Sequence, residues 1–508
     1  MAKRTAIIDI GSNSARLVIF EKTSRYGFCI ICEQKSKVRI GEGAYEKEGI
    51  LQPIGLKRAY LALKSFLNTI KKHEAKKILC IATSAIRDAP NGNLFISWIK
   101  RELGLSIKII DGKKEALYGA IAASNLLPID EGITIDIGGG SSDMALMHKG
   151  NIIDTYSLNL GTVRLKELFF DKSMPIESIN EKAKIYIRQE LQKLPEHFKH
   201  TLAIGIGGTA RALSKAIIKE SLHPLEKIHA FTYSSRDWRT YLEAIPLSSA
   251  KNLKRFKLDK NRYDTIREGT LIFNEILRVI GADFIISSGV GVREGIFLEQ
   301  LLKGSSFRFP TTLNPSIISI LDRFRPFLPT EKTKRNKLNL GSKLYHTLKI
   351  HFTQNDDFHR ELLYALELSD IGNALTVYKS HQHAFYIAMQ ELNYGFTHGQ
   401  IVLIASLLRM HGKELLLKSL YQEYKILLPS KEVLLWLSFI YTLTVFVHEA
   451  SNGAAIEFHY ASKILTITSD KPLYLAKEKI KTLQKPIPFA IIIKDEDHIP
   501  KNRALNIV

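Results

Sequence analysis

The octapeptide Asp136-Ile137-Gly138-Gly139-Gly140-Ser141-Ser142-Asp143 gives the strongest indication of how this chain folds. It follows the β-type run 132–135 and precedes a second apolar run, 144–147, so the pattern predicts a strand, a glycine turn and another strand. Three consecutive glycines allow a sharp turn whose backbone N–H groups can bind phosphate oxygens closely. Asp136, at the end of the first strand, can bind Mg²⁺ beside that turn. A glycine-rich hairpin without a ligand is the alternative.

The same motif occurs a second time, near the N-terminus. Asp9-Ile10-Gly11-Ser12-Asn13-Ser14-Ala15-Arg16 aligns with it without gaps at an offset of 127 residues, and Asp, Ile, Gly and the later Ser recur in register. A single repeat of this length indicates a duplicated domain, because a solenoid needs several shorter units. Two such lobes would hold a phosphate chain between two turns, each of which contributes an aspartate. This is the arrangement of actin-like phosphotransferases.

The composition is that of a basic globular protein. Its 508 residues allow about three or four domains, and 45% hydrophobic with 24% charged residues is ordinary for a soluble chain. The formal net charge of +21 is unusual and favours a polyanionic partner, without distinguishing nucleic acid, polyphosphate and anionic lipid. The basic run 251–267 predicts a cationic track for such a polyanion, and a solvated basic surface is its alternative.

Cysteine content and apolar runs indicate the compartment. Three cysteines without a disulfide framework predict a reducing, cytoplasmic environment. Cys29 and Cys32 lie in a predicted strand, where side chains three positions apart point to opposite faces and cannot hold one metal ion. No signal peptide is expected, since Asp9 interrupts the first apolar run. The longest apolar run, 433–447, is shorter than the ~20 residues of a membrane span, which predicts a buried helix.

Two further positions in the first lobe carry charges that suit phosphate chemistry. After a predicted helix over 54–73, a strand over 78–82 places Arg87 near a helix start, where a guanidinium can bind phosphate. A surface ion pair is the alternative for Arg87. Glu115 is expected in the first turn of the next helix, where the helix dipole stabilises a carboxylate. A rigid helix start also orients a general base toward a water molecule.

The second lobe repeats the pattern of strand, turn and helix. We expect such transitions at 157–165, 202–211 and 282–295, and a long helix over 262–280 that carries Arg262 and Arg267. Each glycine in these turns could serve only tight packing. Several glycine turns at the ends of β-rich runs are more typical of one phosphate-binding cleft.

The chain is therefore expected to be an α/β protein with two actin-like, ribonuclease H-like lobes, a helical domain and a small α+β cap. The linker is predicted from its Gly, Ser and Pro content, and the helical domain from its leucine periodicity. The predicted boundaries are 1–125 for the first lobe, 126–302 for the second, 303–315 for the linker, 316–448 for the helical domain and 449–508 for the cap.

Six motifs within the first 300 residues, in one order and at comparable spacings, resemble those of the exopolyphosphatase/guanosine pentaphosphate phosphohydrolase family. They are Asp9-Ile-Gly-Ser-Asn-Ser, Ala82-Thr-Ser-Ala-Ile-Arg87, Glu115-Ala, Asp136-Ile-Gly-Gly-Gly-Ser, Gly205-Ile-Gly-Gly-Thr and Ser288-Gly-Val-Gly-Val-Arg-Glu-Gly295. The resemblance implies a phosphohydrolase that depends on Mg²⁺, or alternatively Mn²⁺. It would release terminal phosphate processively from inorganic polyphosphate or convert pppGpp to ppGpp. We expect a homodimer with no membrane and no specific nucleic-acid partner.

The same resemblance implies roles for individual residues. Glu115 would be the catalytic base, and Asp136 together with Asp9 would bind the metal ion. The implied phosphate-binding residues are Gly11, Ser12, Asn13, Ser14, Arg16, Arg87, Gly138, Gly139, Gly140, Ser141, Gly207, Gly208, Thr209, Arg267, Gly289 and Arg293. Many family members have a second acidic residue before the catalytic glutamate, where this chain has Lys114. A lysine in place of an acidic residue is expected to alter either the pKa of Glu115 or the electrostatic attraction of the substrate.

The helical domain resembles the degenerate HD-type domain of longer family members. His346, the stretch 365–372 and the pair His381 and His383 follow that layout, but Ser369 stands where the histidine of the His-Asp pair would be. Without that ligand we expect a scaffold that shapes a polyanion channel or a dimer interface, rather than a second metal centre.

Two alternatives to a hydrolase remain open. An actin-like kinase shares the aspartate and glycine turns but needs an organic acceptor, so phosphate release without an acceptor would distinguish the two. A sensor that only binds pppGpp or polyphosphate would gain nothing from a carboxylate such as Glu115 facing a polyanion.

Overall fold

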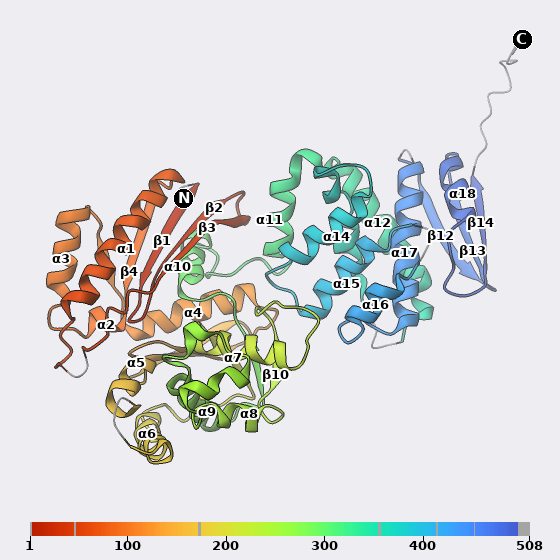
Figure 1. Ribbon diagram of the computed structural model, residues 1–508. Coiled ribbons are helices and arrows are strands. Elements are labelled where there is room, and N and C mark those ends of the chain that lie inside the picture. Colours follow the sequence, from red (N-terminus) through yellow and green to blue (C-terminus); the bar gives the residue numbers. More distant parts are fainter. Residues whose placement is uncertain are drawn as a thin grey trace, which may run out of the picture. The chain divides into compact units, whose positions relative to one another are not determined.

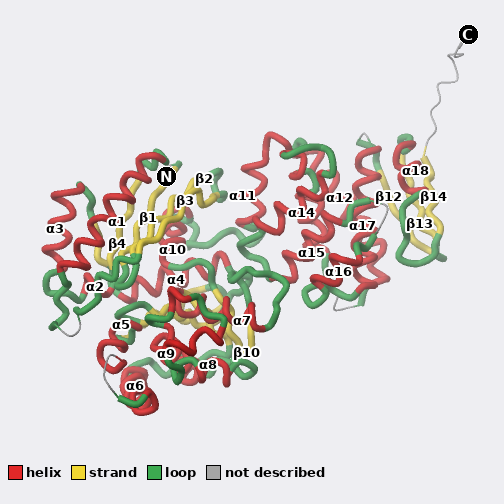
Figure 2. Tube along the Cα trace, in the orientation of Figure 1, coloured by secondary structure: helices red, strands yellow, loops and turns green. Residues whose placement is uncertain are grey.

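The computed structural model of this chain describes residues 3–44, 47–170, 174–353, 357–412, 415–451 and 453–495. The chain divides into two compact units, Met1–Ser319 and Ile320–Val508 (Figure 1). The first unit contains two mixed sheets with their helices, and the second contains mainly helices and one small sheet (Figure 2). The α/β class predicted from the sequence is confirmed, whereas the finer domain boundaries remain predictions.

The first lobe is built on a five-stranded sheet, and both apolar runs that flank its glycine turn are strands. The sheet has the order β3-β2-β1-β4-β5, with β1 Arg4–Ile10, β2 Ala15–Lys22, β3 Phe28–Ser36, β4 Lys77–Ala82 and β5 Ile107–Ile109. The first three strands are antiparallel neighbours, while β4 is parallel to β1 and β5 to β4. Helices α1 (Pro53–Lys72) and α3 (Gly92–Leu103) contribute buried apolar residues such as Leu63 and Phe95 to its core.

The second lobe repeats this topology in a six-stranded sheet. Its order is β10-β11-β9-β6-β7-β8, with β6 Gly132–Ile137, β7 Ser142–His148, β8 Asn151–Leu158, β9 Leu202–Ile206, β10 Thr232–Ser234 and β11 Phe284–Ser287. β6, β7 and β8 form an antiparallel meander, as β1, β2 and β3 do, and β9 is parallel to β6 as β4 is to β1. The predicted repeat of the motif therefore corresponds to a repeat of the surrounding strands.

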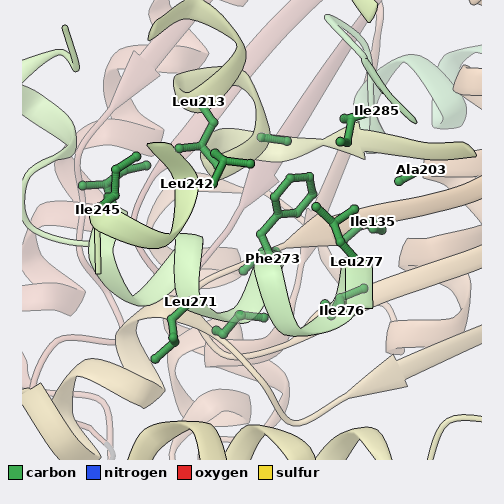
Figure 3. Close-up of a cluster of buried hydrophobic side chains, with 14 of the residues drawn as sticks. Ile135, Ala203, Leu213, Leu242, Ile245, Leu271, Phe273, Ile276, Leu277 and Ile285 are labelled. Carbon is green, nitrogen blue, oxygen red and sulfur yellow. The ribbon is translucent and has the colours of Figure 1, made fainter. Parts of the chain in front are cut away.

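The core of the second lobe lies between its sheet and helix α9 (Ile266–Ile280). Phe273 and Leu277 of α9 cluster with Ile135 and Ile285, which come from two strands of the sheet (Figure 3). The other segments of this lobe are α5 Thr162–Leu165, η1 Lys166–Phe170, α6 Ile176–Leu191, α7 Gly207–Glu220, α8 Arg239–Ala244, η2 Ala250–Phe256, η3 Lys260–Arg262 and α10 Val292–Leu301.

The start predicted for the helix over 262–280 is wrong. It begins at Ile266, and Arg262 belongs to the separate 3-10 turn η3. Asp259, Asn261 and Asp264 explain the difference, because short polar side chains compete for backbone hydrogen bonds and favour turns over helix interiors. Arg262 and Arg267 consequently lie on different elements.

Two helices each pack on the sheet of the other lobe. Helix α4 (Gly112–Leu126) buries Ala116 and Ala120 in the cluster that contains Ile204 of the second sheet. Helix α10, which follows the last strand of the second lobe, stacks Phe297 on Phe20 of the first sheet with ring centroids 4.3 Å apart. This exchange places Glu115, near the N-terminus of α4, in the same cavity lining as the glycine turn of the second lobe.

The second unit combines helices with a three-stranded sheet. Its segments are α11 Pro315–Phe324 at the boundary, η4 Arg325–Phe327, α12 Glu331–Leu348, η5 Lys349–His351, α13 His359–Leu368, η6 Ile371–Ala374, α14 Ser380–Glu391, α15 His398–Arg409, α16 Lys418–Tyr424, α17 Lys431–Ala450, β12 Ile456–Ala461, β13 Ile464–Ser469, α18 Tyr474–Lys481 and β14 Ala490–Asp495. Strands β12, β13 and β14 and helix α18 lie in the segment where a small α+β cap was expected. Within the described ranges, α17 alone is long and apolar enough to cross a membrane, with a mean hydropathy of 1.6, and 78% of that stretch is buried in the protein. Such burial is typical of a core helix.

Candidate active site

A cavity of about 350 Å³ lies between the two lobes of the first unit, at the ends of both sheets. Most of the residues predicted from the sequence line it. They are Asp9, Gly11, Ser12, Asn13, Ser14, Arg16, Glu115, Asp136, Gly138, Gly139, Gly207, Gly208 and Arg293. Their presence in one cavity is a finding of the structure, and the role of each residue remains a prediction.

The two glycine turns meet face to face in this cavity. A Cβ added at Gly139 would lie only 2.4 Å from the Cβ of Ser12, so the approach of the turns requires glycine there. Gly207 has a φ of +77°, and a Cβ there would lie 2.1 Å from Oδ1 of Asp136. Glycine at these two positions therefore keeps backbone N–H groups open to the cavity and leaves the Asp136 carboxylate unobstructed.

The carboxyl groups of Asp9, Asp136 and Asp143 lie close enough to Glu115 to act on it, and all but Asp143 line the cavity. Glu115 occupies the first turn of α4, as predicted, and the N-cap Asp111 accepts a hydrogen bond from the backbone N of Lys114. Burial raises the pKa of Glu115 well above its usual range, and Asp143, Asp136 and Asp9 raise it further. Arg87 opposes this shift, with Nη1 3.8 Å from Oε2 of Glu115. A carboxylate with a raised pKa is a better proton acceptor than an exposed one.

Asp143 ends the glycine motif of the second lobe and is an acidic residue for which the sequence predicted no role. It accepts hydrogen bonds from Ser157 Oγ at 2.5 Å and from Ser141 Oγ at 3.1 Å. Burial, reinforced by Asp136, raises its pKa to about 7 against the effect of these hydrogen bonds. Its position in the motif could have indicated a role, because the pairing of the two strands of the hairpin puts Asp143 opposite Asp136.

The carboxylates Asp9 and Asp136 fit a hard divalent cation such as Mg²⁺. Burial raises the pKa of each, although Arg293 and Arg16 oppose the shift, so a further cation nearby would stabilise both carboxylates. Among the described residues, no group of three or more His, Cys, Asp or Glu side chains is placed to hold a metal ion. Mg²⁺ does not need such a group, because it is commonly bound by one or two carboxylates together with waters and substrate phosphates.

The lining of the cavity is also strongly basic. Arg16 and Arg293 were predicted there, and the structure adds Lys35, Lys37, Arg211 and Arg262. Arg211 is held by Ser288 O at 2.8 Å and Val290 O at 3.0 Å, while burial and Arg293 lower its pKa to about 10. These cations lie on β2, β3, α7, η3 and α10, except Lys37, which directly follows β3, so only the tertiary fold brings them together.

Several predicted phosphate-binding residues lie outside the cavity lining. Arg87 lies behind Glu115 and donates to Ile110 O at 3.2 Å. Ser141 points to Asp143, and Thr209 is buried. Gly140 accepts from Arg164 through its carbonyl, and the N of Gly289 donates to His229 Nδ1 at 3.1 Å.

Arg267 also lies outside the lining of the cavity. Its guanidinium carbon is 5.4 Å from the centre of the Phe170 ring, an arrangement that favours a cation–π contact. Arg262, on the preceding turn, lines the cavity instead. The displaced start of α9 accounts for this difference.

The second unit holds an internal ion pair at Ser369 and Asp370, where the resemblance predicted an altered His-Asp pair. Nζ of Lys337 donates to Ser369 Oγ at 2.6 Å and to Asp370 Oδ2 at 2.5 Å, and the Lys337 side chain is only 4% exposed. His346 packs against His359, with ring centroids 4.8 Å apart, and His381 lies 6.4 Å from His411. His383 lies on the same helix as His381, α14. A lysine ammonium therefore neutralises the carboxylate that an HD-type site would offer to a metal ion.

Comparison with known proteins relates the first unit to one family. The model of the Ppx/GppA phosphatase family matches residues 18–304. The bifunctional 3-dehydroquinate synthase/phosphatase of Fusobacterium nucleatum is 33% identical over 310 residues, which are 58% of this chain but only 46% of that protein. The guanosine-5'-triphosphate,3'-diphosphate pyrophosphatase of Photobacterium profundum is 24% identical over 416 residues, 81% of this chain and 80% of that enzyme.

Solved structures extend the likeness to the fold. The Aquifex aeolicus member of the Ppx/GppA family has a TM-score of 0.51 at 27% identity, covering 60% of this chain and 99% of that one. An exopolyphosphatase from Cytophaga hutchinsonii has a TM-score of 0.55 at 24% identity, with the same coverage, and shows the fold alone. The family model matches residues 18–304, so it covers most of the two lobes, from a point after the first glycine turn, and not the second unit.

Proposed function

The chain belongs to the Ppx/GppA phosphatase family, and from that premise we propose that it is a Mg²⁺-dependent phosphoanhydride hydrolase. It releases terminal orthophosphate processively from inorganic polyphosphate, or converts pppGpp to ppGpp. We further propose that it works as a cytoplasmic homodimer that needs neither a membrane nor a specific nucleic acid. The observation that carries the proposal is the composition of the cavity lining, which brings the carboxylates of Asp9, Glu115 and Asp136 together with the guanidinium groups of Arg16, Arg211 and Arg293.

The terminal phosphate of the substrate would lie between the two glycine turns. Backbone N–H groups of the turns that begin at Gly11 and Gly138 are suited to its oxygens, because they are fixed before the substrate arrives. Arg16 and Arg293 would bind the phosphates that become the leaving group and stabilise the negative charge that develops there. Mg²⁺, held by Asp9 and Asp136, would neutralise charge on the phosphate oxygens when bound.

Glu115 would supply the base for the attacking water. Its carboxylate would accept a proton from the water as the oxygen bonds to the terminal phosphorus, and the phosphoanhydride bond on the opposite side would break. Orthophosphate and a chain one phosphate shorter would be the products. Arg87, behind Glu115, would keep part of the base ionised in spite of its burial. Phosphoanhydride cleavage needs such positioning and charge stabilisation more than covalent catalysis.

The test is phosphate release by the full chain without any organic acceptor. Long-chain polyphosphate and pppGpp would be supplied separately with Mg²⁺, and orthophosphate would be measured colorimetrically. Release from either substrate is expected, and the ratio of their kcat/KM values would assign the preference. No release from either, with phosphate transfer only when an organic acceptor is added, would favour a kinase and contradict the proposal. Binding of both without any turnover would favour a sensor.

A further inference from the structure

Lys35 is a cavity-lining cation without an acidic partner. It lies near the end of β3, opposite Arg16 in the register of β2 and β3. No described residue forms an ion pair or a hydrogen bond with its ammonium group. The charges that act on it most strongly are all positive and belong to Arg16, Arg262, Lys37 and Arg293.

The acids near Lys35 are already engaged by other cations. Glu33, two positions earlier on the same strand, lies 3.4 Å from Arg293 and 4.0 Å from Arg16. Asp264 lies 2.8 Å from Nζ of Lys37. Lys35 therefore lies in a part of the cavity where like charges repel and where an incoming anion would relieve the repulsion.

Arg262 adds a second unsatisfied donor in this part of the cavity. Its Nε is buried and has no hydrogen-bond partner among the described residues. Its guanidinium packs against Gly208, where an added Cβ would come within 2.9 Å of both terminal nitrogens. A buried donor without a partner is costly, so a bound acceptor at this position would stabilise it.

The charge of the cavity lining differs between the part near Glu115 and the part near Lys35. The charges that act most strongly on Glu115 are Asp143, Asp136, Asp9 and Arg87, and none of these acts strongly on Lys35. Asp9 and Asp136 lie between these two parts, since both also respond to Arg16 and Arg293. A phosphate chain whose terminal unit lies at the carboxylates would extend toward Lys35.

We propose that Lys35 is a specificity-determining residue that, with Arg262, binds a phosphate of the substrate remote from the bond that is cleaved. This inference rests on the proposed function, which places the terminal phosphate beside Glu115. The distal subsite would favour ligands with three or more consecutive phosphates over pyrophosphate. Its contribution would be to affinity rather than to the chemical step.

The geometry has a consequence for pH. Partial burial and the neighbouring cations Arg16, Arg262, Lys37 and Arg293 lower the pKa of Lys35 to about 8. The free protein thus loses this charge as pH rises through about 8, whereas a bound polyanion would favour the charged ammonium and raise its pKa. Affinity should therefore be full below that pH and should fall as pH rises above it.

The experiment measures binding of tripolyphosphate and of pyrophosphate to the full chain by calorimetry, with Mg²⁺, at pH 7 and pH 9.5. All variants would carry Glu115→Gln to slow turnover. Lys35→Met removes the charge, and Lys35→Arg keeps it at both pH values. Lys108→Met is the matched control, since Lys108 is exposed on β5 of the same lobe and lies outside the cavity lining. Thermal unfolding would verify that each variant is folded.

Lys35→Met should weaken tripolyphosphate binding at pH 7 by at least about tenfold, with a smaller change for pyrophosphate. Lys35→Arg should restore the affinity and reduce its fall between pH 7 and pH 9.5, since titration of the ligand itself is common to all variants. An effect of Lys35→Met no larger than that of Lys108→Met, or an equal loss for both ligands, would overturn the inference. So would a fall with pH in Lys35→Arg as steep as in the parent.

The test separates this inference from the proposed function. One outcome is that the chain with Glu115 intact releases no phosphate from any substrate while tripolyphosphate binding still depends on Lys35. In that case the proposed hydrolase activity would be contradicted, and the proposed phosphate subsite at Lys35 would be supported. If the chain hydrolysed its substrate but binding did not depend on Lys35, the proposed hydrolase activity would be supported and the subsite at Lys35 would be contradicted.

Discussion

The two glycine turns of the first unit have the same backbone but opposite charges at one equivalent position. In each turn the glycine N donates to the carbonyl of the serine three residues later, at 3.1 Å from Gly11 to Ser14 and at 2.8 Å from Gly138 to Ser141. Across the hairpins, however, Arg16 faces Asp9, whereas Asp143 faces Asp136. A single strand position thus gives one turn a cation and the other a second carboxyl group.

This difference indicates how a duplicated backbone acquires two tasks. Arg16 lines the cavity, where a positive charge favours the binding of phosphate. Asp143 is buried beside Asp136 and raises the pKa of Glu115. We infer that the first turn serves mainly binding and the second mainly chemistry.

The largest expected effect concerns the base near the second turn. Glu115→Gln should lower kcat by about 10²–10⁴-fold with substrate binding largely retained, because the amide keeps the size of the side chain but accepts no proton. Initial rates of orthophosphate release would measure it. The exposed Glu102 on α3 provides the control Glu102→Gln. Near-parental turnover in Glu115→Gln would remove Glu115 from the role of base.

Metal dependence should be the next most sensitive property. Asp136→Asn should raise the Mg²⁺ concentration for half-maximal rate by at least about tenfold, because a neutral amide binds a hard cation less well than a carboxylate. A Mg²⁺ titration of the initial rate measures the change, and Asp130→Asn, at an exposed position of the same lobe, is the control. An unaltered Mg²⁺ requirement in a folded Asp136→Asn variant would exclude Asp136 as a ligand.

The comparison of the turns is tested directly by a pair of variants at the equivalent positions. Arg16→Gln should raise KM by about tenfold with a smaller change in kcat, since it removes a charged hydrogen-bond donor to phosphate. Asp143→Asn should lower kcat by about tenfold with a smaller change in KM, since it removes a carboxyl group that raises the pKa of Glu115. Steady-state kinetics on one substrate would measure both. If the two variants altered kcat and KM in the same proportions, the division of tasks would be wrong.

The smallest effect is expected on the basic run of the second lobe. Two cations of this run already have partners in the structure, since Arg255 donates to Ser248 Oγ and Lys257 lies 3.2 Å from Glu220. Replacing two exposed lysines of the run, Lys251 and Lys254, by Gln should raise KM for long polyphosphate by a few fold, about 2–5, and less for pppGpp, because exposed charges are screened. The salt dependence of the long-chain reaction should also become flatter. Equal changes in KM for both substrates would place the track elsewhere.

The sequence predicted what depends on local pattern. The alternation of apolar residues around Asp9 and Asp136 predicted both hairpins, and the spacing after 107–110 predicted the helix start that carries Glu115. Asp143 was within reach of the same reasoning, since strand pairing puts it opposite Asp136.

What depends on tertiary packing was not predicted. Lys35 and Arg262 are separated along the chain and line one cavity only because the tertiary fold brings β3 and η3 to it. The exchange of α4 and α10 between lobes likewise follows from the burial of residues such as Ala120 and Phe297 against strands of the other lobe. Arg267 was predicted to bind phosphate through the family resemblance, whereas the structure places Arg262, on the separate turn η3, in the cavity lining.

The Lys337–Asp370 pair of the second unit has a consequence for experiments with chelators. The cation that balances Asp370 is covalently part of helix α12, so it cannot dissociate or exchange with ions in the medium. Because removing one partner of a buried ion pair strongly destabilises a fold, this covalent charge also ties the packing of α12 to the end of α13 at every metal concentration. EDTA should therefore leave this part of the fold intact, and any loss of activity on chelation would report on the cavity between the two lobes.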